Sequence, residues 1–259
     1  MSDAVNALHD AIVASLALPA SCRVDQRVPK KMLAEHGGAT AADRRLLTDG
    51  IEEAHWLAAI KPATTTIPTW RDEVREYLEL AVLSMAARPT YAQPAQLQRL
   101  AELVHRAVPY PVLLIVSTPD AVAMSLSHKR TAQNEAGRVV LDGDVVSFQF
   151  SDELPDGLLD ALALGQQPQQ DLKALYQGWM DTLLAAQVAR VTGHFSMDPT
   201  TDQAAMRRIA LIEHQQLEAE AARLRALAGK ESQIAKRVDQ NLALQRLQAE
   251  LAAVRARLQ

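Results

Sequence analysis

The sequence predicts an α/β protein in which a small mixed sheet with helices is followed by a C-terminal helical region and a coiled coil. An apolar run at Leu78–Leu83, an amphipathic segment at Pro94–Val108 and a second apolar run at Val112–Val116 mark the expected core. Two predicted hairpins follow these segments. The chain is only 4% aromatic and rich in alanine and leucine, which favours helix over sheet for the bulk of the structure.

The first sixty residues predict mainly helices. Residues 3–17 carry apolar side chains at helical spacing. Residues 27–31 form an extended segment before a short helix at Lys31–Glu35, which two glycines end. The next predicted helix begins at Thr40 or Ala41 and reaches Ala58. Its expected buried stripe, with Trp56 near the end, consists of Leu46, Leu47, Ile51, Ala54 and Ala58.

The stretch from Glu76 to Met85 has two interpretations. Its apolar residues match a helical stripe and helix-forming residues dominate, so periodicity slightly favours a helix. A buried strand explains the continuous apolar run equally well. Just before it, residues 61–70 are β-branched and contain two prolines, which predicts a short edge strand or an extended loop.

Strand signals follow the amphipathic helix. Val112–Val116 is a short apolar run after two prolines, and Ala121–Ser127 alternates between apolar and small polar residues. The segments Arg138–Leu141 and Val145–Phe150 flank Asp142 and Gly143, a dipeptide that favours tight turns between paired strands. We therefore predict that these two segments form a hairpin.

After Ser151 the pattern is helical to the end of the chain, with Asp171 capping one helix and Asp202 starting the terminal segment. Leu217 starts an apolar seam, and Gly229 is expected to bend or break the helix. If unbroken, the seam would be roughly 60 Å long, so it requires a partner helix. The seam continues through Leu224, Leu227, Ile234, Val238, Asn241, Leu244, Leu247, Leu251, Val254 and Leu258.

These elements suggest four regions: an N-terminal helical segment (1–60), an α/β core (61–152), a helical linker region (153–200) and long C-terminal helices with the coiled coil (201–259). From Gln203 onward ten Lys or Arg residues outnumber six Asp or Glu, although the whole chain carries a net charge of −4. A mildly basic tail is compatible with contact to nucleic acid or an acidic partner, but such a balance is more often a solvated face.

Cysteine usage and hydropathy indicate a cytoplasmic protein. Cys22 is the single cysteine, so no internal disulfide can form and a reducing compartment fits. No apolar run approaches the ~18 residues of a membrane span, and the N-terminus lacks a signal-peptide pattern. We expect no membrane association.

Residue chemistry alone assigns no activity, metal or cofactor to the sequence. It has no glycine-rich phosphate loop, no paired Cys/His spacing for zinc and no Gly-x-Ser-x-Gly motif, and its seven histidines are scattered. Glu79 and Lys129 are weak candidates for a metal-dependent nuclease, in which carboxylates hold Mg²⁺ and a lysine assists attack by water. Ser127 occupies the position where a second acid would be expected, so a polar strand end is the simpler interpretation.

Basic residues give a second group of candidates. His128, Lys129 and Arg130 are consecutive at a strand end, and Lys30 and Lys31 precede a short helix. All five could contact the phosphates of nucleic acid or the acidic groups of a partner. Solvated positions are the simpler explanation for the two lysines.

Several segments together resemble an uncharacterised bacterial family described only as a domain of unknown function. The segments that carry the resemblance are Leu18–Ser21, Val28–Lys31, Trp56 with Lys61–Thr64, Arg106–Pro111, Ser127–Arg130 and Gln233–Asn241. The resemblance implies a small α/β core followed by C-terminal helices, and genes that lie beside DNA methyltransferase and helicase genes in restriction or phage-defence loci. It also implies that residues 76–85 are a strand, so that 76–85, 95–108 and 112–116 would form a right-handed β-α-β unit with parallel strands.

We therefore expect a non-catalytic accessory or scaffold subunit of a bacterial phage-defence system that contains a methyltransferase and a helicase. Its coiled coil would form a homodimer or a hetero-complex with those subunits. The alternatives are a divergent metal-dependent nuclease that uses Glu79 and Lys129, and a nucleic-acid-binding module that uses Lys30, Lys31, Lys129 and Arg130.

Overall fold

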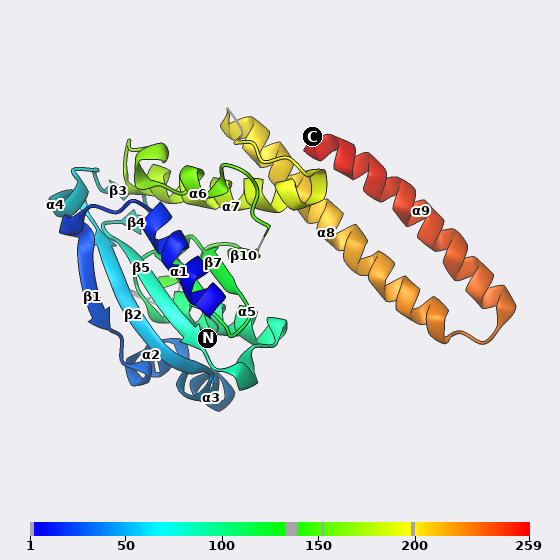
Figure 1. The fold of residues 1–259 in the computed structure, drawn as a ribbon, viewed down its shortest axis with the longest axis horizontal. Helices are drawn as coiled ribbons and strands as arrows, with labels where there is room; N and C mark the ends of the chain where they lie inside the picture. Colours follow the sequence, from blue (N-terminus) through cyan, green and yellow to red (C-terminus); the bar gives the residue numbers. More distant parts are fainter. Residues whose placement is uncertain (1–2, 133–138, 152, 198–199) are drawn as a thin grey trace. The chain divides into compact units, whose positions relative to one another are not determined.

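A mixed six-stranded sheet in the order β1-β2-β5-β6-β7-β10 is the centre of the fold (Figure 1). The structure is a computed structural model that describes residues 3–132, 139–151, 153–197 and 200–259. The chain divides into two units, Met1–Leu183 and Leu184–Gln259, and the sheet belongs to the first. The strands of the sheet are β1 (Arg23–Arg27), β2 (Ile51–Ile60), β5 (Leu80–Ala87), β6 (Val112–Ser117), β7 (Val122–Leu126) and β10 (Val146–Phe150).

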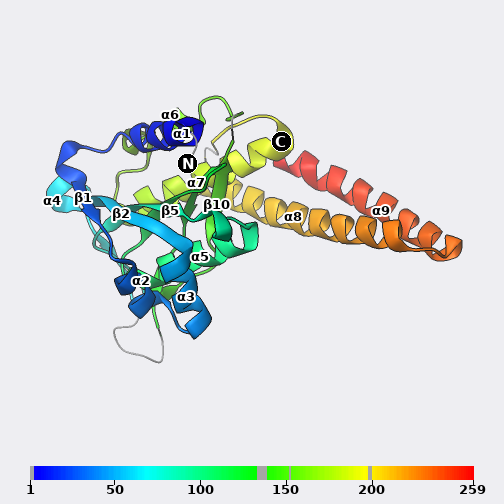
Figure 2. The same cartoon turned by 60° about the horizontal axis from the view of Figure 1, so that its bottom comes forward.

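Helices cover both faces of this sheet, and Figure 2 shows α1 and α6 on one side and α2, α3 and α5 on the other. Two small two-stranded sheets accompany it, one of β3 (Trp70–Arg71) and β4 (Glu76–Tyr77), the other of β8 (Lys129–Thr131) and β9 (Val139–Leu141). The helices are α1 (Asp3–Ser15), α2 (Lys30–Gly37), α3 (Ala41–Gly50), α4 (Pro62–Thr65), α5 (Pro94–Ala107), α6 (Leu158–Ala161) and α7 (Leu172–Thr192). Short 3-10 turns lie at Ala20–Cys22, Pro89–Tyr91 and Leu164–Gln166.

The predicted strand, helix and parallel strand are confirmed, but the first strand is Leu80–Ala87 rather than 76–85, because Glu76–Tyr77 forms β4 of a separate small sheet. β5 and β6 pair in parallel from Ala81 with Val112 onward, and α5 connects them. Both strands are buried on both faces, which explains why their sequences are continuously apolar rather than alternating. β7 then pairs antiparallel with β6 through the turn after Ser117, as the sequence indicated.

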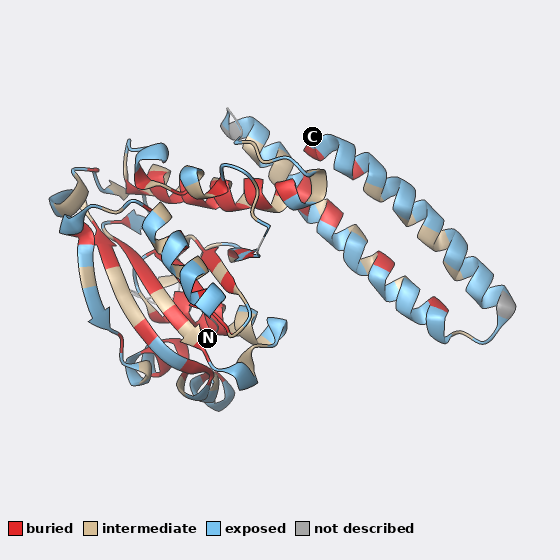
Figure 3. Ribbon diagram, in the orientation of Figure 1, coloured by how far each residue is buried: buried red, intermediate tan, exposed pale blue. Residues whose placement is uncertain are grey.

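The core between the sheet and the helices α2, α3 and α5 is aliphatic. Figure 3 shows the burial along β2 and β5. The buried residues of this core include Leu33, Leu47, Leu83, Met85, Leu100, Val104, Leu114 and Val116. Arg99 of α5 donates to Asp43 Oδ1 of α3 from Nε at 3.0 Å and from the second guanidinium nitrogen at 2.8 Å. This bond lowers the pKa of Asp43, and it joins the two helices at the edge of the core.

The first correction concerns residues 51–60, which form strand β2 and not the end of a helix. Ile51, Ala54 and Ala58 are buried, a spacing that matches one face of a helix. In the structure this spacing arises from two irregularities in the pairing with β5, one between Ile51 and Glu53 and the other between Trp56 and Ala58. Each irregularity shifts the alternation of the strand, so the period of two residues disappears from the sequence.

The first region is consequently not purely helical, because β1 and β2 supply two strands of the main sheet. Residues 61–70 also differ from the predicted strand or loop. They contain the short helix α4, which has Pro62 at its first position, and reach β3 only at Trp70. The αL residue Thr66 ends α4.

The second correction concerns the predicted hairpin at Asp142–Gly143. Gly143 does have a positive φ of 90°, but the strands beside it do not pair with each other. β9 pairs with β8, and β10 pairs with β7 in continuous register from Val146 with Leu126 to Phe150 with Val122. The reason is burial, because Val146, Phe148 and Phe150 are buried as part of the main sheet. Arg138 lies outside the described residues.

The second unit contains the end of α7 and an antiparallel pair of helices, α8 (Thr201–Lys230) and α9 (Ile234–Leu258). Val254 and Leu258 of α9 pack against Leu211 of α8 and Val188 of α7. Helix α8 ends at Lys230, next to the predicted break at Gly229. The two halves of the expected long seam therefore lie on two helices that pack against each other. In the described part of the chain, no helix combines the length and apolarity needed to span a membrane.

Candidate functional site

The segment Ser127–Arg130, which contains three candidate residues, lies where β7 ends and β8 begins. Successive side chains of an extended segment point to opposite faces. His128 and Lys129 therefore lie in different surroundings, although they are adjacent in sequence. The predicted basic cluster is thus not one surface, and each residue has separate contacts.

His128 belongs to a hydrogen-bonded group of aromatic residues. Its Nε2 donates to Gln177 Oε1 of α7 at 2.8 Å, and its Nδ1 accepts from the hydroxyl of Tyr77. The hydroxyl of Tyr176 accepts from the amide of Ser127 at 2.9 Å and donates to the carbonyl of Val112 at 2.7 Å. Burial raises the pKa of both tyrosines, so they remain neutral hydrogen-bond donors. These bonds attach the first half of α7 to the sheet.

Lys129 is a buried lysine at the C-terminal end of α5. Lys129 is only 3% exposed. Its Nζ donates to the carbonyl of Val108, the C-cap residue of that helix. The negative end of the helix dipole favours a cation there. Burial nevertheless lowers the pKa of Lys129 to about 7, because desolvation disfavours the charged form.

His105 and Ser125 form a buried pair, and His105 is close enough to Lys129 to feel its charge. Ser125 is on β7, and its Oγ is 2.9 Å from Nε2 of His105 on the inner face of α5. Burial, with the nearby charge of Lys129 as a smaller cause, lowers the pKa of His105 to about 3. Its Nδ1 is buried without a hydrogen-bond partner among the described residues. The imidazole is therefore neutral at physiological pH.

A small pocket of 160 Å³ opens next to Lys129, and Tyr110 and Arg130 line it as well. The Nε of Arg130 is 3.7 Å from Asp142, but that carboxylate also accepts from Arg75 at 2.6 Å, so one negative charge is shared between two guanidinium groups. The pocket thus contains a buried amine and a guanidinium that is only partly compensated.

Glu79 is separate from Lys129 in its contacts. Its carboxylate lies 3.7 Å from Nζ of Lys61, whereas burial alone lowers the pKa of Lys129, with no contribution from a neighbouring carboxylate. Within the described ranges, no group of three or more His, Cys, Asp or Glu side chains is placed to hold a metal ion. The two candidate residues thus have separate partners, Lys61 for Glu79 and the carbonyl of Val108 for Lys129.

Lys30 and Lys31 lie at the start of α2 and differ in their contacts. Lys30 donates to the carbonyl of Ile51 at 3.0 Å, and Lys31 is 3.8 Å from Glu35 on the exposed side of the helix. Lys31 is free to contact a partner, whereas Lys30 fixes the position of α2 against β2.

The seam residues differ in their burial within the second unit. Val254 and Leu258 are buried, and four others are partly buried between α8 and α9, namely Leu224, Leu244, Leu247 and Leu251. Asn241 is exposed, so in this pairing it does not occupy the interior position expected of a register-fixing residue. Leu227 and Val238 are exposed as well. The side chain of Ile234 lies outside the described residues.

The sequence interpretation did not identify Ser125 and His105 as a site. The available signal was the position of His105 four residues after Ala101 and eight after Leu97, which places a polar ring on the buried face of α5. Ser125 was only a small residue in an alternating strand. Their proximity depends on the crossover that places α5 over β7, which the local pattern does not encode.

Fold and site together define a three-layer α/β protein with a buried Lys–His–Ser cluster, followed by a C-terminal helical hairpin. Residues 16–251 match the family described as Domain of unknown function (DUF4391), and the chain belongs to this family. No curated protein and no solved structure matches the chain.

Proposed function

We propose that the protein is a non-catalytic accessory subunit of a bacterial phage-defence system that contains a DNA methyltransferase and a helicase. In this proposal the helical hairpin α8–α9 docks on one of those subunits. The chain resembles a family whose genes lie beside methyltransferase and helicase genes, and this resemblance supplies the context. The observation that carries the proposal is the exposed apolar surface of the hairpin.

This surface has two parts. Met206, Ile209 and Ile212 recur every three residues on one face of α8, and their exposed fractions are 62%, 62% and 44%. We call these three residues the α8 stripe. Leu227 and Val238 lie near the turn of the hairpin and are 43% and 49% exposed. Large aliphatic side chains grouped in this way are typical of a surface that a partner covers.

The pairing between α8 and α9 explains why the α8 stripe remains exposed to solvent. The two helices bury one face against each other through residues such as Leu211, Leu217 and Val254. The α8 stripe lies on another face of the helix, so the pairing of α8 with α9 does not bury it. An apolar helix face that fits into a groove of another protein is a common mode of recognition.

The test is capture of the purified methyltransferase and helicase subunits by the full chain. The wild-type protein should retain one of them, and the variant Ile209→Glu with Ile212→Glu should bind at least about tenfold more weakly, because a buried charge replaces an apolar anchor. Both positions are exposed, so the fold should persist. Binding is measured by biolayer interferometry.

A matched control is Gln203→Glu with Gln216→Glu, which adds the same charge at exposed positions of the same helix. Val238→Glu tests the surface near the turn separately. Wild-type protein that captures neither subunit, or a stripe variant that binds as well as the control, would contradict the proposal. A doubled mass in light scattering that only the stripe variant loses would instead assign the surface to a homodimer.

A further inference from the structure

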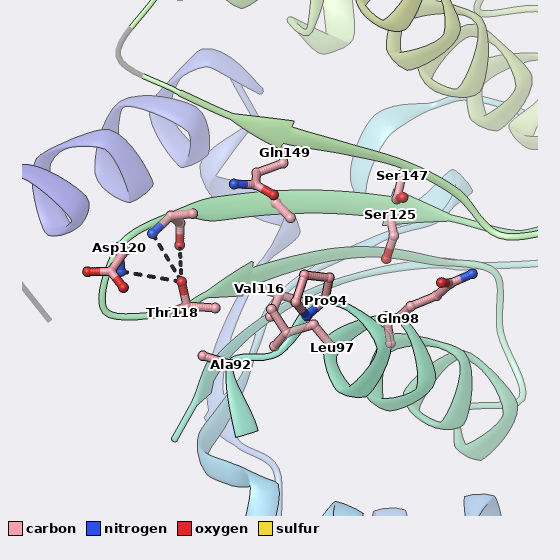
Figure 4. Close-up of a pocket in the computed structure, with 13 residues that line it drawn as sticks. Ala92, Pro94, Leu97, Gln98, Val116, Thr118, Asp120, Ser125, Ser147 and Gln149 are labelled. Atoms are coloured by element: carbon pink, nitrogen blue, oxygen red, sulfur yellow. Dashed lines mark hydrogen bonds between the residues drawn. The ribbon is translucent and has the colours of Figure 1, made fainter. Parts of the chain in front are cut away.

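A second and larger pocket lies at the opposite end of the buried cluster, between the N-terminal half of α5 and the strands β6, β7 and β10 (Figure 4). Its volume is 380 Å³, within the range of about 300–1,000 Å³ that is usual for small-molecule sites. The hollow is lined on the strands that face α5 by three small residues, Ala123, Ser125 and Ser147, which leave space above the helix. It also lies beside the carboxyl end of β6, where open α/β sheets commonly bind ligands.

The polar wall of this pocket is a pair of serines. Ser125 of β7 and Ser147 of β10 are directly opposite each other in the strand register, and both line the pocket. Directly opposite residues in antiparallel strands have Cβ atoms about 5 Å apart, so the two hydroxyls present adjacent hydrogen-bonding groups. Figure 4 shows Gln98 of α5 beneath them, with Gln149 farther along β10.

His105 sets the direction of the Ser125 hydroxyl. The imidazole is neutral, and we assign its proton to Nε2, because this leaves a lone pair rather than an N–H group without a partner at the buried Nδ1. The nearby charge of Lys129 also disfavours the protonated, charged form of this ring. Nε2 then donates to Ser125 Oγ at 2.9 Å, so the Ser125 hydroxyl is left to donate its own proton to a ligand.

The same geometry argues against nucleophilic catalysis by Ser125. A general base works best with a pKa near the operating pH, whereas the pKa of His105 is about 3. Among the described residues, the second ring nitrogen also has no carboxylate partner of the kind that orients a catalytic histidine. The pocket is thus arranged for binding.

The chemistry of the lining selects the ligand. Its hydrogen-bonding side chains are uncharged apart from Asp120 at the exposed turn, and no cationic side chain is among the described residues that line it. An anion would therefore have no counter-charge there. Pro94, Leu97 and Val116 give an apolar surface beside the polar wall. Amide and hydroxyl groups next to apolar surface recognise the edge and the face of a planar heterocycle.

We propose that this pocket binds a nucleobase or nucleoside, with Ser125 donating to an acceptor on the ring edge and Gln98 contributing a second contact. The α5 residues Pro94 and Leu97 would lie against the face of the ring. This site is independent of the hairpin surface, so a failure of partner capture and a failure of nucleoside binding are distinguishable.

The test is titration of the full chain with adenosine, guanosine, cytidine and uridine, followed by isothermal calorimetry and ligand-observed NMR. At least one nucleoside should bind saturably, while ribose and inorganic phosphate should not. Gln98→Ala should weaken binding by about threefold to tenfold, because one neutral hydrogen bond is lost. Ala123→Leu should abolish binding by filling the hollow.

Ser125→Ala removes the donor hydroxyl at nearly constant volume and should weaken binding about tenfold. Should this buried change prevent folding, the exposed residue Gln98 still provides the test. The matched control is Gln216→Ala on α8, which should bind as the wild type does. The proposal is overturned if no nucleoside binds at millimolar concentration, if ribose or phosphate binds equally well, or if Gln98→Ala and Ala123→Leu both leave affinity unchanged.

Discussion

Replacing Lys129 with methionine is expected to remove an alkaline rise in the stability of the protein. The folded chain releases the Lys129 proton at a pKa of about 7, whereas the unfolded chain holds it up to the ordinary value of 10.5. The unfolded state thus binds more protons between these two values, so the free energy of unfolding rises with pH in this window. The expected increase from this one group is about 5 kcal/mol.

Urea denaturation followed by circular dichroism at several pH values measures this effect. Lys129→Met should lose the rise and should be more stable than the wild type at and below pH 7, where the wild type bears the full cost of a buried ammonium. Lys31→Met is the matched control, because Lys31 is exposed on α2. A wild-type stability that stays level across this window, or falls with pH to the same extent in both variants, would show that Lys129 is not buried as described.

The second large effect is expected at Trp179, which is fully buried in the first half of α7. Its Nε1 donates to the carbonyl of Leu162 at 2.9 Å, so the indole both fills the core and satisfies a buried acceptor. Trp179→Ala should lower the free energy of unfolding by about 3–5 kcal/mol, because a large cavity forms and the carbonyl loses its partner.

Urea denaturation monitored by far-ultraviolet circular dichroism avoids dependence on tryptophan fluorescence. Trp56→Ala is the control, since Trp56 on β2 is only partly buried and should cost clearly less. A loss below about 1 kcal/mol for Trp179→Ala, typical of surface substitutions, would contradict the described packing of α7.

Local sequence patterns predicted the central strand-helix-strand unit well. Val112–Ser117 and α5 follow the expected boundaries closely. The strand is buried on both faces and is therefore continuously apolar, whereas the helix is buried on one side and has apolar residues at helical spacing. The strand at β5 was ambiguous from periodicity, and the family resemblance gave the right choice. Asp171 also caps α7 as expected, since its carboxylate accepts from the amide of Ala174 at 2.8 Å.

The misses have identifiable physical causes. In β2, two pairing irregularities gave Ile51, Ala54 and Ala58 a helical spacing. At the Asp142–Gly143 turn, local turn preference was correct for Gly143, but burial of the apolar face of β10 decided which strands pair. Tertiary packing commonly overrides such local preferences.

The candidate site was harder to predict than the fold. The sequence indicated Lys129 as a candidate. It could not reveal that Lys129 donates a hydrogen bond to the carbonyl of Val108 at the end of α5. His105 and Ser125 are 20 residues apart and meet only through the packing of α5 on β7. Contacts of this kind depend on topology, which composition and spacing leave undetermined.

Strand β1 at one edge of the sheet has a further consequence for the behaviour of the protein at high concentration. It is short, interrupted by a bulge between Arg23 and Gln26, and mostly exposed, and Asp25 has a positive φ of 48°. Charged side chains and local distortion hinder the addition of a strand from another molecule. We therefore expect this edge to resist pairing with strands of other molecules and the fibril growth that such pairing starts.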